Sequence, residues 1–186
     1  MNRPTITVAV ATCGRADGLA RCLDALASGT MSPDEVIVVD QAPSLAAATV
    51  AEAAPLPVRY LTQERRGLSA SRNLALAETT SDALAVTDDD CVPDSQWVAS
   101  LILALGAETH GLVTGPILPL GERPVDGYGV SLREGTELIV HRERIAPWHV
   151  GSGANMAGFR TVLQQLGGWD ERLGTGSAGR AGEDIA

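Results

Sequence analysis

Three consecutive aspartates, Asp88, Asp89 and Asp90, follow closely on an apolar run from Ala83 to Val86. The run predicts a buried strand, and because aspartate favours turns over strands, we expect the acids to occupy the loop after it. Three like charges in a row repel one another, and a nearby cation relieves that repulsion. Carboxylate oxygens suit Mg²⁺ or Mn²⁺, which take few protein ligands and leave room for substrate phosphates. The triplet therefore predicts a metal–phosphate site, with a solvated acidic turn as the alternative.

A second predicted strand, Glu35–Asp40, also ends in an acid. Between the two acidic strand ends, Gly67–Ala77 predicts a loop that enters a helix and carries Arg72. An arginine beside a helix start suits a phosphate or base contact, with a surface salt bridge as the alternative. Because ligands of an open α/β sheet bind outside the carboxyl ends of its strands, we expect these side chains to share one site.

The elements that must position this site alternate between strands and helices. Apolar β-branched runs predict the strands, and apolar residues at helical spacing predict the helices. We expect strands at Ile6–Ala11, Glu35–Asp40, Val58–Leu61, Ala83–Val86 and Leu112–Leu118, and helices at Asp17–Ala27, at Leu45–Ala53, within Gly67–Ala77 with Ser69 or Ser71 as the cap, from Pro93–Asp94 onward, and at Gly158–Leu166. This order indicates an α/β protein with a mostly parallel sheet flanked by helices. Residues 119–147 predict a long excursion with a candidate strand at Glu137–His141.

The composition indicates a globular protein and excludes several functions. Hydrophobic residues make up 45% of the 186 residues, which is enough for one large domain or for a domain with an extension. The formal net charge of -9 argues against nucleic acid as a partner. All 14 Lys and Arg residues are arginine, which excludes a P-loop lysine, a pyridoxal Schiff base and a lysine nucleophile. With no apolar run of roughly 18 residues and no secretory cleavage pattern, we expect no transmembrane segment and a cytoplasmic protein, with a peripheral place at the inner membrane surface as the alternative.

Seven short strings, in this order along the chain, point to one family. They are ITVAVATCGR, EVIVVD, GLSASRN, VTDDDCVP, GSGANMAGFR, GGWDERLGTG and GED. Together the strings resemble an inverting family-2 glycosyltransferase with a GT-A (Rossmann-like) fold, over nearly the whole chain from Thr5 to Asp184. The resemblance implies a nucleotide-sugar donor, a divalent metal on an Asp-x-Asp motif, and a carboxylate base near the end of the chain. It also implies that residues 1–186 form a single GT-A domain, cut short on its acceptor side.

The resemblance assigns the first and second strand ends to the nucleotide. Ala11, Thr12 and Arg15 stand where the family's first loop meets the nucleotide. Asp40 holds the first acid of the family's usual pair. Gln41 replaces the second acid, which reads the pyrimidine ring in related enzymes. The amide carbonyl of glutamine can also accept a hydrogen bond from a pyrimidine N–H, although without charge, so a UDP- or dTDP-sugar is favoured and a GDP-sugar is the alternative.

The acidic triplet and its neighbour Arg72 receive roles in the same way. Arg72 lies in the family's nucleotide-facing loop, and Asp88 and Asp90 form Asp-x-Asp. The resemblance directs Asp88 toward the ribose and the metal and Asp90 toward the metal, which is Mg²⁺ or Mn²⁺. Asp89, between them, is grouped with the nucleotide-sugar-binding residues.

The fifth and seventh strings are assigned to the sugar and to catalysis, respectively. Gly153, Ala154 and Asn155 match the strand that lines the donor sugar. Glu183 and Asp184 match a Glu-Asp pair in which Asp184 is the general base and Glu183 stands beside it. A base on the opposite face of the sugar from the leaving diphosphate gives inversion at the anomeric carbon in one step.

The sequence thus predicts a metal-dependent glycosyltransferase that moves a sugar from a nucleoside-diphosphate-sugar to an acceptor hydroxyl of unknown identity. One alternative is a non-catalytic nucleotide-sugar-binding module. Another is a sugar nucleotidyltransferase, but the first loop supplies Arg15 without a lysine, and Asp184 would have no role. A dehydrogenase is the weakest alternative, since no G-x-G-x-x-G follows the first strand.

Overall fold

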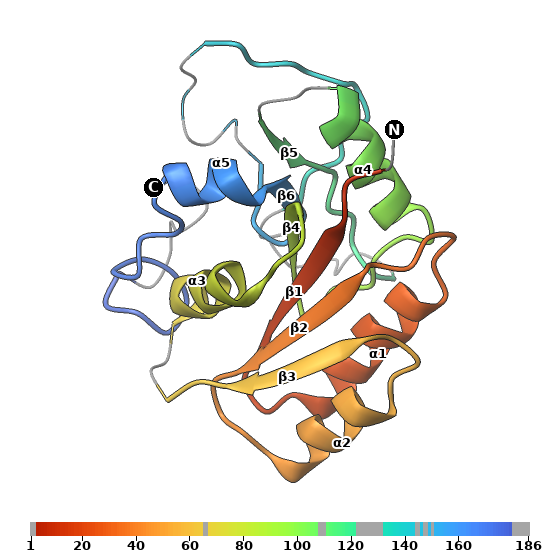
Figure 1. Cartoon of the computed structure of the whole chain (residues 1–186), viewed down its shortest axis with the longest axis vertical. Helices are drawn as coiled ribbons and strands as arrows, with labels where there is room; N and C mark the ends of the chain where they lie inside the picture. Colours follow the sequence, from red (N-terminus) through yellow and green to blue (C-terminus); the bar gives the residue numbers. More distant parts are fainter. Residues whose placement is uncertain are drawn as a thin grey trace.

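Residues 3–64, 67–107, 111–121, 132–143, 146, 149 and 151–179 are the part of the chain that the computed structural model describes. In this part, six strands form one sheet in the order β3-β2-β1-β4-β6-β5 (Figure 1). The elements in chain order are β1 (Ile6–Thr12), α1 (Ala16–Ala27), β2 (Glu35–Asp40), α2 (Leu45–Ala53), β3 (Val58–Thr62), α3 (Leu68–Glu78), β4 (Ala83–Asp88), α4 (Trp97–Ala107), β5 (Leu112–Thr114), β6 (Met156–Phe159) and α5 (Arg160–Gln165).

The sheet is mostly parallel, as the alternation of elements predicted. Strands β3, β2, β1 and β4 run parallel to their neighbours, whereas β6 is antiparallel to both β4 and β5. The α/β class with helices on the sheet is therefore confirmed. Among the described helices, none is long and apolar enough to cross a membrane.

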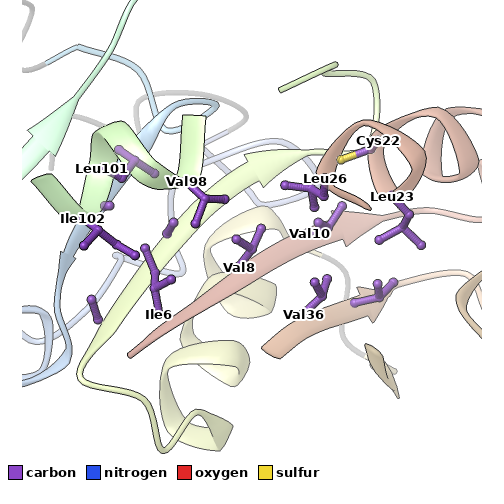
Figure 2. Packing of buried hydrophobic residues seen from close by; sticks show 14 of the residues in the cluster. Ile6, Val8, Val10, Cys22, Leu23, Leu26, Val36, Val98, Leu101 and Ile102 are labelled. Carbon is purple, nitrogen blue, oxygen red and sulfur yellow. The ribbon is translucent and has the colours of Figure 1, made fainter. Parts of the chain in front are cut away.

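Helices cover both faces of the sheet because alternate residues of each strand point to opposite faces. Figure 2 shows Ile6, Val8 and Val10 of β1 packed against apolar side chains of α1 and α4. Leu19, Cys22, Leu23 and Leu26 of α1 recur at helical spacing and are all buried. The opposite face carries Ala9, Ile37 and Val39 under α3 and α5 (Figure 1). Burial of each such leucine or isoleucine stabilises the fold by about 1.5–3 kcal/mol.

The antiparallel end of the sheet differs from the prediction. The predicted helix Gly158–Leu166 was wrong at its start, because residues 156–159 pair with β4 as strand β6 and the helix begins only at Arg160. The strand expected at Leu112–Leu118 has only three residues, β5, and is followed by Gly115 and Pro116. Proline has no N–H to donate to a ladder, so a strand does not continue through it readily.

The strand predicted at Glu137–His141 is not formed, and this expectation was wrong. Leu138, Ile139 and Val140 are 89%, 68% and 47% exposed, so these apolar residues pack against no sheet. The β-bridge found in this part of the described chain joins Ile117 to Arg133. A strand needs a partner for its backbone hydrogen bonds, and the β-branched composition of this segment does not supply one.

Two helix starts were also misplaced. Helix α4 begins at Trp97, after a turn in which the Asp94 carboxylate accepts a hydrogen bond from the Gln96 N–H at 2.9 Å. Helix α3 has Gly67 at its N-cap with a φ of 143°, and neither Ser69 nor Ser71 caps it. A φ of this sign suits glycine, which has no Cβ to clash.

Candidate active site

The carboxyl ends of three neighbouring strands meet at one edge of the sheet, which we call the carboxyl edge. In the register, Thr12 lies opposite Asp40, and Ala11 lies opposite Asp88. Strand β6 begins beside this edge, since Met156 pairs with Val86. The structure therefore brings the loops after β1, β2 and β4, and the residues just before β6, to the same place.

The three aspartates of the triplet face three different environments. Asp88 is the last residue of β4, and its side chain is 28% exposed. The side chain of Asp89 is fully buried, and that of Asp90 is 61% exposed. A turn closes immediately afterwards, with the Cys91 N–H donating to the Asp88 carbonyl at 3.1 Å. The triplet is therefore not a uniform acidic turn, because Asp90 faces water and Asp89 faces the protein.

Asp89 is paired within the protein by the loop after β1. The Thr12 hydroxyl donates to its Oδ2 at 2.6 Å, and Arg15 Nε donates to the same oxygen at 3.0 Å. Arg15 Nη2 forms an ion pair with the other carboxylate oxygen, and Arg15 Nη1 lies 3.4 Å from Asp90 Oδ2. Partial burial lowers the pKa of Arg15, but the carboxylates around it outweigh that effect and raise the pKa overall. Arg15 is therefore a permanent cation beside the triplet.

A second arginine approaches the triplet from α3. Arg72 is only 3% exposed, and its Nη2 lies 3.5 Å from Asp88 Oδ1. Arg72 therefore forms an ion pair with Asp88 from a buried position and not from the surface. Arg15 pairs with Asp89 and Asp90, and Arg72 pairs with Asp88, so the carboxyl edge carries both positive and negative side chains.

Asp40 is fully buried at the end of β2 and joins two loops. Its Oδ1 accepts hydrogen bonds from the N–H groups of Gly14 at 3.1 Å and Ala42 at 2.9 Å. Its Oδ2 accepts from the Tyr60 hydroxyl at 2.6 Å. Burial, together with this hydrogen bond to Asp40, raises the pKa of Tyr60 to about 12. Tyr60 was missed in the sequence, because nothing in its own segment indicates a contact with an acid on the neighbouring strand.

Gln41 is held by the start of α3. Its Oε1 accepts a hydrogen bond from the Gly67 N–H at 2.7 Å. Since an N–H donor must face an oxygen, this contact fixes which end of the amide points toward α3. The carbonyl oxygen that we expected to accept from a pyrimidine N–H thus already accepts one hydrogen bond from the backbone and keeps a second lone pair for another donor.

Gly153, Ala154 and Asn155 lead into β6 beside the end of β4. The Asn155 side chain accepts from Trp97 Nε1 at 2.8 Å and donates to the Pro116 carbonyl at 2.9 Å. Its amide therefore ties the start of α4 to the segment after β5. Trp97 packs partly buried against the core, and this hydrogen bond gives its indole N–H an acceptor.

The segment after α5 packs along α3 and leads the chain toward the carboxyl edge. The Trp169 N–H and carbonyl both bond to the Asn73 side chain, each at 2.8 Å. Ser69 Oγ donates to the Leu173 carbonyl at 3.0 Å. The predicted catalytic pair, Glu183 and Asp184, lies outside the described residues.

The carboxylates at the carboxyl edge suit a divalent metal that takes few ligands from the protein. Within the described ranges, no group of three or more His, Cys, Asp or Glu side chains is arranged to hold a metal. Mg²⁺ at a phosphate site commonly takes one or two carboxylates and completes its shell with water and phosphate oxygens. Asp90, which faces water, and the partly exposed Asp88 supply that number of carboxylates.

Known proteins resemble this chain over most of its length. The sequence model described as Glycosyl transferase family 2 matches residues 7–167. A pre-mycofactocin glycosyltransferase of Mycobacterium tuberculosis is 30% identical over 125 residues, which are 64% of this chain and 25% of that protein. The mannosyltransferase PcManGT from Pyrobaculum calidifontis, solved in complex with GDP-Man and Mn²⁺, is 26% identical with a TM-score of 0.68, covering 96% of this chain and 51% of that chain.

A second solved structure shares the fold at lower identity. S. aureus TarS 1-349 in complex with UDP-GlcNAc gives a TM-score of 0.71 at 18% identity, over 97% of this chain and 51% of that chain. These structures confirm the expected GT-A architecture. The chain spans only 25% of the length of the first relative and 51% of each structural neighbour.

Proposed function

Because this chain belongs to glycosyl transferase family 2, we propose that it carries the donor site of an inverting glycosyltransferase that uses a nucleoside-diphosphate-sugar. The observation that carries this proposal is that two arginines form ion pairs with the aspartate triplet at the carboxyl edge. Arg15 and Arg72 come from different elements and meet at the edge where open α/β sheets bind their ligands. A guanidinium group can bind two oxygens of a phosphate at once, because its N–H donors match phosphate geometry.

In this proposal the carboxyl edge holds the nucleotide. Arg15 would face the diphosphate, the buried Arg72 would hold Asp88 in place toward the ribose, and Asp90 would hold Mg²⁺ or Mn²⁺ with help from Asp88. When bound, the metal would neutralise charge on the diphosphate as it leaves. The GDP-Man and Mn²⁺ complex of PcManGT, at 26% identity, supports this assignment. The backbone at Ala11 completes the wall of the site, since it lies opposite Asp88 in the sheet.

The reaction transfers the sugar in one displacement. The acceptor hydroxyl attacks the anomeric carbon from the face opposite the diphosphate, a new C–O bond forms, and the bond to the diphosphate breaks. The hydroxyl proton passes to a carboxylate base, for which we propose Asp184 with Glu183 beside it. Gly153–Asn155 would line the sugar, with Asn155 holding the wall through its contacts to Trp97 and Pro116. We expect Asp184→Asn to lower turnover by about 10²–10⁴-fold and leave donor affinity nearly unchanged.

Calorimetry with UDP, GDP and dTDP, each with and without Mn²⁺, tests the donor site. We expect one nucleotide to bind in a metal-dependent manner, and Asp90→Ala to abolish the metal dependence. Asp24→Ala, on the exposed side of α1, is the matched control and should change nothing. Binding to the unmodified chain that does not depend on metal would contradict the proposal. Hydrolysis of nucleotide sugars with Mn²⁺ separates an enzyme from a binding module.

The proposal extends to the nucleobase of the nucleotide-sugar donor. We favour uracil or thymine, with guanine as the alternative that the GDP-Man complex of PcManGT supports. We expect Gln41 to distinguish uracil or thymine from guanine, because its amide offers both a hydrogen-bond acceptor and hydrogen-bond donors. The three nucleoside diphosphates in the same calorimetry series decide between them.

A further inference from the structure

The middle aspartate of the triplet differs from its neighbours in burial. The Asp89 side chain is fully buried, whereas those of Asp88 and Asp90 are 28% and 61% exposed. A carboxylate out of water is costly unless charge and hydrogen bonds compensate it. Both Asp89 oxygens are compensated, one by Thr12 and Arg15 Nε and the other by Arg15 Nη2. A nucleotide at the carboxyl edge would find this carboxylate already engaged.

Three residues spaced three apart in the sequence converge on Asp89. Thr12 ends β1, Arg15 lies just before α1, and Gly18 lies in its first turn. At Gly18 a Cβ atom would come within 2.9 Å of the Asp89 carbonyl oxygen, closer than real Cβ contacts. Helix α1 can therefore approach the triplet only because position 18 has no side chain. The loop after β1 and the loop after β4 are locked together at Asp89.

The contacts between Arg15 and Asp89 fix the direction of the Arg15 guanidinium. With Nε and Nη2 on Asp89, the planar fork leaves Nη1 beside Asp90, at 3.4 Å from Oδ2. The Arg15 side chain is 57% exposed, so its cation is accessible to a ligand at that point. A bidentate pair holds the plane of a guanidinium, which a single contact does not.

We propose that Asp89 is a positioning residue, which holds the Arg15 guanidinium beside Asp90 to receive the diphosphate and does not itself contact the donor. This inference rests on the proposed function, since the diphosphate is that of the donor. It divides the triplet into two outward carboxylates for ligands and one inward carboxylate that orients a cation.

A double-mutant cycle on nucleotide affinity tests the inference. Calorimetry compares the unmodified chain, Arg15→Ala, Asp89→Asn and the double variant, using whichever of UDP, GDP or dTDP binds with Mn²⁺. Loss of a hydrogen-bonded charge should weaken binding about tenfold in each single variant. If Asp89 acts through Arg15, Asp89→Asn should cost nothing further once Arg15 is alanine. Losses that multiply in the double variant would overturn the inference.

One further variant keeps the test decisive if Asp89→Asn fails to fold, and one further measurement applies if Asp89→Asn folds. Arg15→Lys keeps the charge at a half-exposed position but cannot form the fork, so it should bind the nucleotide more weakly. Lysine that binds as tightly as arginine would show that orientation does not matter. The affinity for the nucleoside without phosphates should be unchanged in Asp89→Asn, and a parallel loss there would mean direct contact with the donor.

The controls separate this inference from the proposed function. Asp24→Asn makes the same chemical change at an exposed position of α1 and should leave affinity unaltered. An unmodified chain that binds none of the three nucleotides would refute the proposed function itself. A chain that binds one of them, with losses that multiply in the cycle, would refute only the role of Asp89.

Discussion

Replacement of Asp40 by alanine should destabilise the fold strongly, although the residue lies at the candidate site. Its buried carboxylate accepts hydrogen bonds from the Gly14 N–H, the Ala42 N–H and the Tyr60 hydroxyl. Each hydrogen bond to an ionised group contributes about 1.5–3 kcal/mol. Water can reach the two loop N–H groups once the side chain is removed, so the full sum is not expected. We expect the free energy of unfolding to fall by about 3–5 kcal/mol, which is less than the sum of the three hydrogen bonds because water recovers part of the loss.

Urea denaturation followed by circular dichroism measures this loss, provided that the slope of the transition stays unchanged. Tyr60→Phe removes one of the three hydrogen bonds and should cost about 1.5 kcal/mol. Asp40→Asn keeps an acceptor for the two loop N–H groups and should fall between these values. Asp24→Ala, at an exposed position, should stay within about 0.5 kcal/mol of the unmodified chain. If Asp40→Ala also stays within that margin, the carboxylate does not join the loops as the structure indicates.

Three other predictions concern single contacts. Because the pKa of Tyr60 is raised from 10.0 to about 12, its contribution to stability should be complete below pH 10 and lost as pH rises through about 12. Thermal unfolding across that window should show this loss in the unmodified chain and not in Tyr60→Phe. Gln41→Asp should tighten UDP binding in calorimetry if the base is uracil, since an ionised acceptor makes a stronger bond. Unchanged UDP affinity would mean that Gln41 does not face the ring. Asn155→Ala removes the acceptor of the Trp97 indole N–H at 2.8 Å and should lower stability by about 1–3 kcal/mol. An unaltered urea midpoint and unaltered Trp fluorescence in Asn155→Ala would contradict the assigned contact.

Local pattern was enough for the architecture of the parallel part of the sheet. The bounds of β2 and α2 agree with the sequence prediction, because an apolar run that stops at an acid and a helix that stops before prolines are both local signals. The antiparallel end was not predictable in this way. Residues 156–159 become a strand only because β4 and β5 lie on either side to pair with them.

The sequence also determined that carboxylates and an arginine would gather at the carboxyl edge, since each stands at or near the end of a recognisable element. It could not determine which way each side chain faces. Asp88, Asp89 and Asp90 are identical in type, yet their exposures range from fully buried to 61%. The difference is made by Arg15, which pairs with Asp89 across 74 positions of the chain. A contact between residues so far apart exists only after β1 and β4 have paired, so tertiary structure alone decides which of three equal acids turns inward.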